Sequence, residues 1–167
     1  TYRQCDAIVQ KTKEHLDKVF SETEMKARYE IMLENYVKTI NIEALTMINM
    51  VNKQILPAVS AYTGELSRTV KDKLAVCPDA NADYEKSAIV KLSALCGKMF
   101  ASVGQLEKLY AEAEKESDAL AAALRARDLL LPVMDTLRAA ADEAEEIVPR
   151  EEWPFPTYGD LLFGVSK

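Results

Sequence analysis

Apolar residues recur every three or four positions along most of the chain, the spacing that places them on one face of an α-helix. The clearest run follows Ser21, which has Glu24 three residues later in a capping-box arrangement and so predicts a helix beginning at Glu22. Its expected buried stripe covers about seven turns: Tyr29, Leu33, Tyr36, Ile40, Ala44, Met47, Val51 and Ile55. The periodicity resumes beyond Pro57 as far as Leu74, which predicts a kink at the proline rather than the end of the helix.

A turn is predicted where Pro78 and an Asp/Asn cluster interrupt the pattern, at residues 77–83. A second long helix is expected from about Tyr84 through Leu124, and its part from Leu106 to Leu124 has the heptad spacing of helices that pack side by side. Pro132 repeats the Leu-Pro pattern of the first helix, and the periodicity continues to about Ile147. The sequence therefore predicts two long Pro-kinked helices folded against each other.

The expected fold class is all-α, an elongated antiparallel bundle of these two helices, a shorter terminal helix over residues 6–19 and an extended aromatic tail. Composition agrees, since helix formers dominate, glycine is scarce and 29% of residues are charged. The 167 residues fit a single helical domain. Because Thr1 is not a Met and opens directly on an amphipathic segment, we expect a piece of a longer polypeptide.

The tail, residues 149–167, differs from the rest of the chain in its aromatic and proline content. Four of the twelve aromatic residues lie in WPFPTYGDLLF: Trp153, Phe155, Tyr158 and Phe163. In one interpretation the prolines hold this segment extended so that the aromatics close the bundle core. In the other it reaches past the bundle and docks on a catalytic domain or a neighbouring subunit. We favour the first, because four aromatics are costly to leave exposed on a small domain.

Charge and cysteine content exclude several classes of protein. The net charge is −6, and residues 111–152 hold twelve acids and five bases, which argues against a nucleic-acid partner. Cys5, Cys77 and Cys96 form no metal or redox motif, so we expect reduced thiols in a cytoplasmic protein. The sequence has no run of 18 apolar residues, and we therefore expect no membrane span.

A search for catalytic and metal-ligating residues finds little. His15 is the one histidine, and no Ser or Cys has a recognisable base near it. Glu30 and Glu34 lie one turn apart, but the Glu-x-x-His pairs of helical di-metal sites are missing, so solvated surface glutamates are the simpler interpretation. We expect no catalytic residue, no metal site and no cofactor in this chain.

The helix over residues 29–50 carries apolar residues on more than one side, because Ile31, Ile42 and Leu45 lie off its main stripe. Such a helix is either the central helix of the domain, the interpretation we favour, or partly faces another domain or subunit. Asn41 and Asn49 interrupt this apolar helix and would need hydrogen-bond partners if buried. We therefore add them to the four tail aromatics as candidate contacts with another domain or subunit.

Two blocks of this sequence, residues 27–66 and 124–163, resemble the carboxy-terminal region of type III glutamine synthetases. The resemblance is close in these blocks and loose between residues 67 and 123. It implies a bacterial cytoplasmic enzyme that joins ammonia to glutamate with ATP and a divalent metal (Mg²⁺), assembled as a dodecamer of stacked rings. The family's catalytic residues match no position here, so the resemblance implies a non-catalytic helical domain that contacts its own catalytic domain and neighbouring subunits.

Two further interpretations belong to other classes of protein. A free-standing helical adaptor could bind a partner helix through the heptad face from Leu106 to Leu124. A metal-carboxylate bundle enzyme would require bound metal. The sequence favours an assembly domain, because the two matched blocks are long and unusual and no active site accompanies them.

Overall fold

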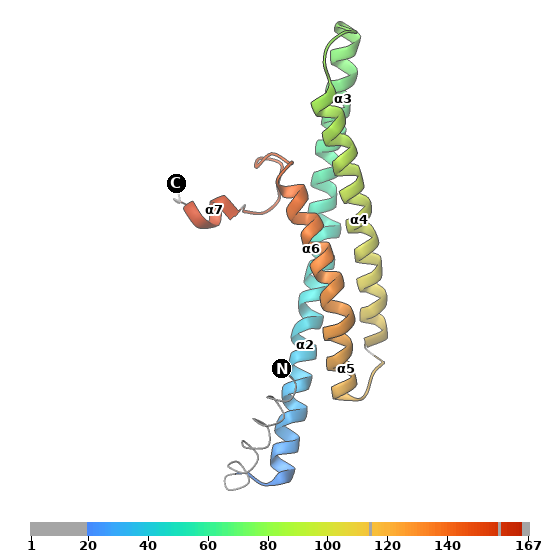
Figure 1. Cartoon of the computed structure of the whole chain (residues 1–167). Coiled ribbons are helices and arrows are strands. Elements are labelled where there is room, and N and C mark those ends of the chain that lie inside the picture. Colours follow the sequence, from blue (N-terminus) through green and yellow to red (C-terminus); the bar gives the residue numbers. More distant parts are fainter. Residues whose placement is uncertain (1–19, 114, 157, 165–167) are drawn as a thin grey trace, which may run out of the picture.

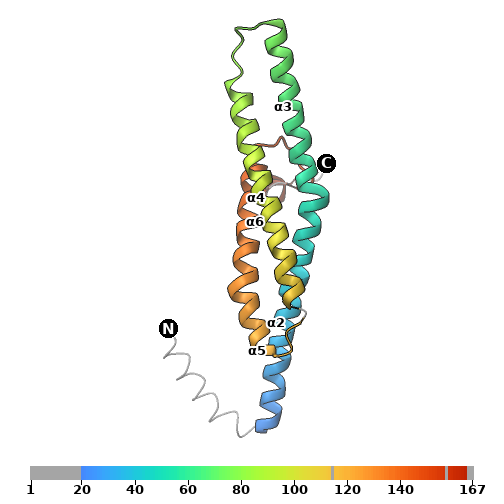
Figure 2. The same cartoon turned by 90° about the vertical axis from the view of Figure 1, so that its right-hand side faces the viewer.

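The computed structural model describes residues 20–113, 115–156 and 158–164. The terminal helix expected over residues 6–19 lies outside these ranges. Within them every regular element is helical, and three long rods lie side by side (Figures 1 and 2). The first rod comprises α2 (Glu22–Met50), η1 (Val51–Ile55) and α3 (Leu56–Val76), the second is α4 (Asp83–Ala113), and the third comprises α5 (Ala119–Arg125), η2 (Ala126–Leu130) and α6 (Leu131–Glu145). The expectation of an all-α bundle is confirmed.

The start of α2 follows the capping signal in the sequence. Ser21 is extended, and its hydroxyl accepts a hydrogen bond from the backbone N–H of Glu24 at 3.3 Å. Its carbonyl accepts a further bond from the N–H of Met25 at 3.0 Å. The first bond is a side-chain cap to an N–H that a helix start leaves unpaired, and the second is the first regular bond of the helix, so the predicted start at Glu22 is confirmed.

Each of the two helix-interior prolines is preceded by one π-helical turn, η1 before Pro57 and η2 before Pro132. The last N–H before each proline bonds five residues back, from Leu56 to the carbonyl of Val51 and from Leu131 to that of Ala126. A proline has no N–H to donate, and its ring crowds the carbonyl four residues earlier. The wider turn accommodates both effects, so the helix continues past each proline as the periodicity predicted.

The turn between α3 and α4 also follows its sequence signal. Cys77 has an extended backbone, and Asn81 caps α4 by accepting a 2.9 Å hydrogen bond from the N–H of Asp83 at its side-chain oxygen. The turn therefore lies within residues 77–83, as predicted.

The second long helix is shorter than expected. It ends at Ala113 rather than continuing to Leu124, and α5 begins at Ala119. Asp118 produces the restart, because its carboxylate accepts a 2.7 Å hydrogen bond from the N–H of Ala121. Leu120 and Leu124 remain 45% and 40% exposed, so the heptad face proposed for an adaptor is not one continuous helix surface.

The core centres on α4, which lies between α3 and α6. Its side chains at a two-turn spacing of seven residues are fully buried at Leu92, Met99 and Leu106. Among the described helices, α4 alone is long and apolar enough to cross a membrane, but here this apolar stripe packs against the neighbouring rods. The other fully buried large side chains come from both neighbouring rods: Val59, Leu130 and Leu137.

The expectation that α2 is the central helix is wrong. Its upper part contributes buried residues at Ile40 and Ala44, but its lower part extends beyond the ends of α4 and α5 (Figures 1 and 2). Tyr29, which the sequence placed on the buried stripe, is 52% exposed. Ile31 and Ile42, which lie off that stripe, are 56% and 65% exposed. The apolar residues on several sides of α2 are therefore uncovered within the described part of the chain.

Candidate interaction surface

Trp153 fixes the start of the tail to the end of the bundle. Its side chain is 8% exposed and belongs to the core cluster, together with Val148 and Ala144. Its N–H donates to the carbonyl of Pro149 at 3.1 Å and to that of Arg150 at 3.3 Å, which closes a turn after α6. A buried indole covers a large apolar area, so this residue closes the core as the first interpretation of the tail expected.

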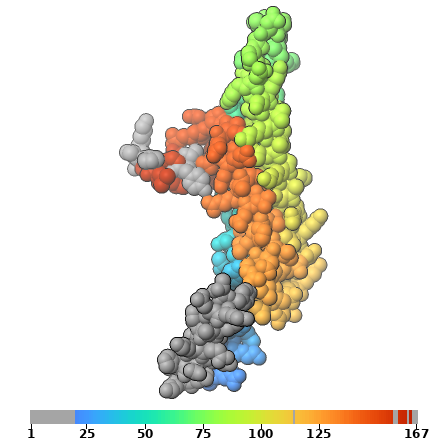
Figure 3. Space-filling model, in the orientation of Figure 1, coloured from blue at the N-terminus to red at the C-terminus, as the bar shows by residue number. Residues whose placement is uncertain are grey.

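Beyond Trp153 the tail leaves the bundle. Figure 1 shows α7 (Tyr158–Phe163) standing away from the side of the rods, and the space-filling view of Figure 3 shows the same arm. The tail was expected to be extended, but these six residues are helical. They follow the last proline, Pro156, and Gly159 is the one residue among them that disfavours a helix. Leu161 and Leu162 are 70% and 74% exposed, so the arm presents apolar side chains to solvent.

A cavity of about 390 Å³ lies where the tail meets the bundle. Its bundle side is formed by residues of α2, η1 and α6, including Met47, Met50 and Leu137, and its tail side by Trp153 and Phe155. Its polar lining residues all come from α6: Arg138, Asp142 and Glu145. The arrangement is an apolar hollow with a charged edge, a surface suited to binding rather than to bond-making chemistry.

Of the residues predicted as contacts, Trp153 and Phe155 both line the cavity, whereas Asn41 and Asn49 do not. Trp153 is buried and Phe155 is half-buried against the core, whereas the side chains of Tyr158 and Phe163 are outside what the structure describes. Asn41 is half-buried, and its side-chain oxygen is buried without a hydrogen-bond partner; Asn49 is exposed. Both asparagines lie on α2. Sequence reasoning missed Met47, Arg138 and the other α2 and α6 residues that line the hollow.

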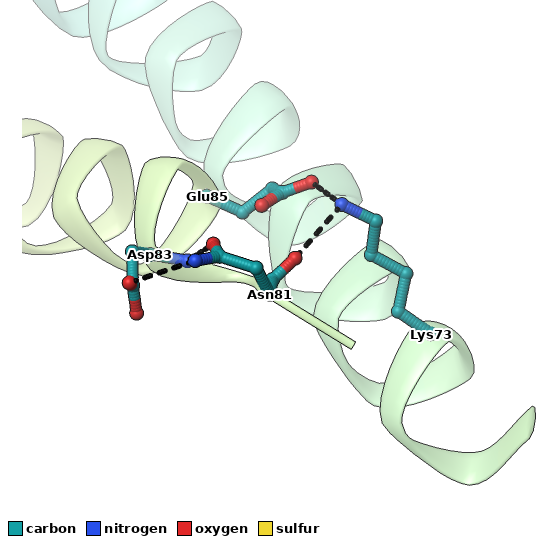
Figure 4. A network of polar contacts seen from close by, with 4 residues as sticks. All are labelled: Lys73, Asn81, Asp83 and Glu85. Atoms are coloured by element: carbon teal, nitrogen blue, oxygen red, sulfur yellow. Dashed lines mark hydrogen bonds and ion pairs between the residues drawn. The ribbon is translucent and has the colours of Figure 1, made fainter. Parts of the chain in front are cut away.

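A polar network joins α3 to the start of α4 (Figure 4). The Lys73 ammonium group donates to the Glu85 carboxylate and to the carbonyl of Asn81, the latter at 3.5 Å. The hydrogen bond from Lys73 lowers the pKa of Glu85, and Asn81 Nδ2 donates to Asp83 Oδ2 at 3.0 Å. Glu85 is buried where the two helices meet, and the ammonium group of Lys73 balances its charge there. This network joins the two helices of the hairpin.

The described residues contain no group of three or more His, Cys, Asp or Glu side chains able to hold a metal ion. His15 lies outside them. Burial raises the pKa of the Cys96 thiol, which makes it less reactive. What the described part of the chain offers is therefore a set of surfaces, of which the tail and the hollow beside it are the most developed.

The known proteins and the family model that this chain resembles all carry the name glutamine synthetase. The family described as Glutamine synthetase C-terminal domain matches residues 5–74. A glutamine synthetase of Butyrivibrio fibrisolvens is 34% identical over 147 residues, which cover 88% of this chain and 21% of that protein. A type-3 glutamine synthetase of Dictyostelium discoideum is 24% identical over 149 residues, covering 87% and 20%. A glutamine synthetase of Bacteroides fragilis is 23% identical over 153 residues, covering 88% and 21%.

The chain thus spans about a fifth of the length of the curated relatives it matches. No solved structure matches it significantly.

Proposed function

Because this chain belongs to the C-terminal domain family of glutamine synthetases, we propose that it is the non-catalytic helical domain of a type III enzyme and serves its assembly and stability. The type III assignment is supported by the relative named as a type-3 enzyme and by the two blocks that resemble that class. The parent enzyme would make glutamine from glutamate, ammonia and ATP in the cytoplasm. Its ATP and Mg²⁺ would bind in the part of the polypeptide outside this chain.

The assembly role is supported by the apolar surface that the described residues leave uncovered. This surface includes large apolar residues of α2 and the tail that are at least 65% exposed: Met32, Ile42, Leu161 and Leu162. Extended apolar surface on a water-exposed domain is typical of contact with another protein. Here the partners would be the catalytic domain of the same polypeptide and the neighbouring subunits of a dodecamer.

Removal of this domain from the parent tests the proposal. We expect the shortened enzyme to sediment as smaller particles and to form glutamine more slowly, because the contacts made by this domain are lost. The isolated chain should form no glutamine. A shortened enzyme that keeps the full particle size and full activity would show that the domain serves neither assembly nor stability.

A further inference from the structure

A second hollow adjoins the cavity beside the tail. It has a volume of about 470 Å³ and is lined by residues 42–47 of α2 and 131–138 of α6. Met47 and Arg138 line both hollows, so the two are neighbours along the seam between α2 and α6, and we call them together the α2–α6 groove. Residues of the tail, Trp153, Phe155, Pro156 and Leu161, line its end beside the tail. No residue of α4 lines either hollow, although α4 packs against both helices. The groove therefore opens on the side of the seam that α4 leaves uncovered.

The walls of the groove have the spacing of a helix-binding slot. On α2 they include Glu43, Met47 and Met50, at steps of four and three residues. On α6 they include residues 131, 135, 138, 142 and 145, also at steps of four and three. On the α2 side the lining runs from residue 42 of α2 to residue 55 of η1, which corresponds to about 20 Å of helix. A helix of about 13 residues would fit this length and would complete a four-helix cross-section.

The apolar lining of the groove is adaptable. Met47, Met50 and Met134 contribute flexible thioether side chains, which suit a surface that must fit a separate helix. Ile42, at the lower end, is 65% exposed although it is a large β-branched residue on a well-formed helix. An amphipathic helix that lays its apolar face in such a groove would cover these side chains.

The rim of the groove is acidic. One of its lining residues is a base, Arg138, and four are acids: Glu43, Asp135, Asp142 and Glu145. Arg138 Nε lies 3.7 Å from Asp142 Oδ2. The groove therefore favours an occupant with positive charge beside its apolar face, and disfavours an acidic one. About four fifths of the length of each relative lies outside the part that this chain matches, which gives the parent ample sequence to supply that occupant.

From this shape and charge, we propose that the α2–α6 groove binds an amphipathic helix with a basic flank from the remainder of the same enzyme polypeptide. The proposal rests on the proposed function and identifies where and with what chemistry the domain docks. The occupant completes the bundle, covers Ile42 and the methionines, and pairs its Lys or Arg side chains with the acids of the rim.

The first test is the labelling rate of a cysteine placed at Ile42, measured in the chain alone and in the full parent enzyme. The background carries Cys5→Ser, Cys77→Ser and Cys96→Ser, and the maleimide-labelled peptides of this domain are quantified by mass spectrometry. The matched control is Val90→Cys, because Val90 is 71% exposed on α4 and lies outside the groove. We expect Ile42→Cys to label at least about tenfold more slowly in the parent, and Val90→Cys to label at similar rates in both proteins. Equal labelling rates of Ile42→Cys in the isolated chain and in the parent would overturn the proposal. If Val90→Cys were slowed in the parent as much as Ile42→Cys, the protection could not be assigned to the groove.

The second test addresses the charge of the occupant. Glu43→Lys with Asp135→Lys in the Ile42→Cys parent should restore fast labelling, whereas Glu30→Lys with Glu107→Lys, the same charge change at exposed sites outside the groove, should leave it protected. Circular dichroism of each variant confirms that the bundle is folded. Protection that survives reversal of the rim would contradict a basic occupant. Protection that appears in the chain alone and increases with its concentration would instead identify a second copy of this chain.

The two proposals fail in distinguishable ways. A parent enzyme that assembles fully without this domain contradicts the proposed function. A parent whose assembly requires the domain, but in which Ile42→Cys labels freely, retains the proposed function and excludes only the groove.

Discussion

Arg150 makes a two-point contact with Asp160 between the base of the tail and α7. Its Nε donates to Oδ2 at 3.1 Å, and its Nη2 lies 2.6 Å from Oδ1. Arg150 lies in the turn after α6, five residues beyond its end at Glu145, and Asp160 lies in the short helix that stands off the bundle. The pair therefore sets the direction of the arm, while the buried indole of Trp153 fixes where it starts.

Loss of this pair should free the arm without unfolding the bundle. For Asp160→Asn we expect the free energy of unfolding to change by less than about 1 kcal/mol, because the Arg150 side chain is 70% exposed and such pairs stabilise little. Hydrogen exchange at the amides of Leu161 and Leu162 should become faster. Asp72→Asn, at an exposed site on α3, is the control and should leave that exchange unchanged. A loss of about 2 kcal/mol or more would mean that the pair supports the bundle itself.

Trp153 should contribute far more to stability than the arm that follows it. Trp153→Ala removes a large side chain that is 8% exposed in the core cluster, and we expect it to lower the free energy of unfolding by about 3 kcal/mol. Leu162→Ala, at a site 74% exposed, should change it by less than about 0.5 kcal/mol in the isolated chain. Urea denaturation followed by circular dichroism measures both. Equal effects of the two substitutions would show that Trp153 does not close the core.

The contact between Lys73 and Glu85 makes stability depend on pH in a predictable direction. The folded state lowers the pKa of Glu85 below its unfolded value, chiefly through the hydrogen bond from Lys73. Stability from this group is therefore fully present above the unfolded pKa, about 4.3 for a glutamate, and is lost as the pH falls through the folded value. Glu85→Gln should be less stable than the wild type at neutral pH, with a difference that shrinks as the pH falls below about 4.

Urea midpoints from pH 7 down to pH 3 would measure this difference. Glu107→Gln, an exposed glutamate on the same helix, is the control and should show a small difference at every pH. A Glu85→Gln difference that is constant over the whole range would exclude the charge of Glu85 as its source.

The parts of the fold that the sequence predicted are those set by neighbouring residues. Ser21 with Glu24 predicts the start of α2, and Asn81 with Asp83 predicts the start of α4. Both signals are local, because a capping residue and its helix are only a few residues apart. The Leu-Pro pairs likewise predicted an uninterrupted rod, although the π-turn that accommodates each proline follows from hydrogen-bond geometry that periodicity does not encode.

The rest depends on how separate helices lie against one another. Periodicity gives an apolar stripe but not the length over which a neighbour covers it, and the lower part of α2 extends past its neighbours, so Tyr29 is exposed. Glu85 meets Lys73 twelve residues away, and the α2–α6 groove joins residues about ninety apart; neither follows from local sequence. Asp118 is different, because its capping signal was present in the sequence but the heptad spacing across it pointed to a continuous helix.

A substitution at Asp118 therefore distinguishes the observed break between α4 and α5 from one continuous helix. The two arrangements predict changes of opposite sign in the free energy of unfolding. In the observed fold its carboxylate caps α5, so Asp118→Ala should lower the free energy of unfolding by about 1 kcal/mol. Asp118→Asn keeps a good capping side chain and should cost much less. In one helix running from Leu106 to Leu124, Asp118 would occupy an interior position, and alanine there would stabilise the protein by about 0.5 kcal/mol. Thermal and urea unfolding of the three proteins measures the difference. If the alanine variant were more stable than the wild type, the result would support one continuous helix from Leu106 to Leu124. It would then also support the heptad face on which the adaptor interpretation depends.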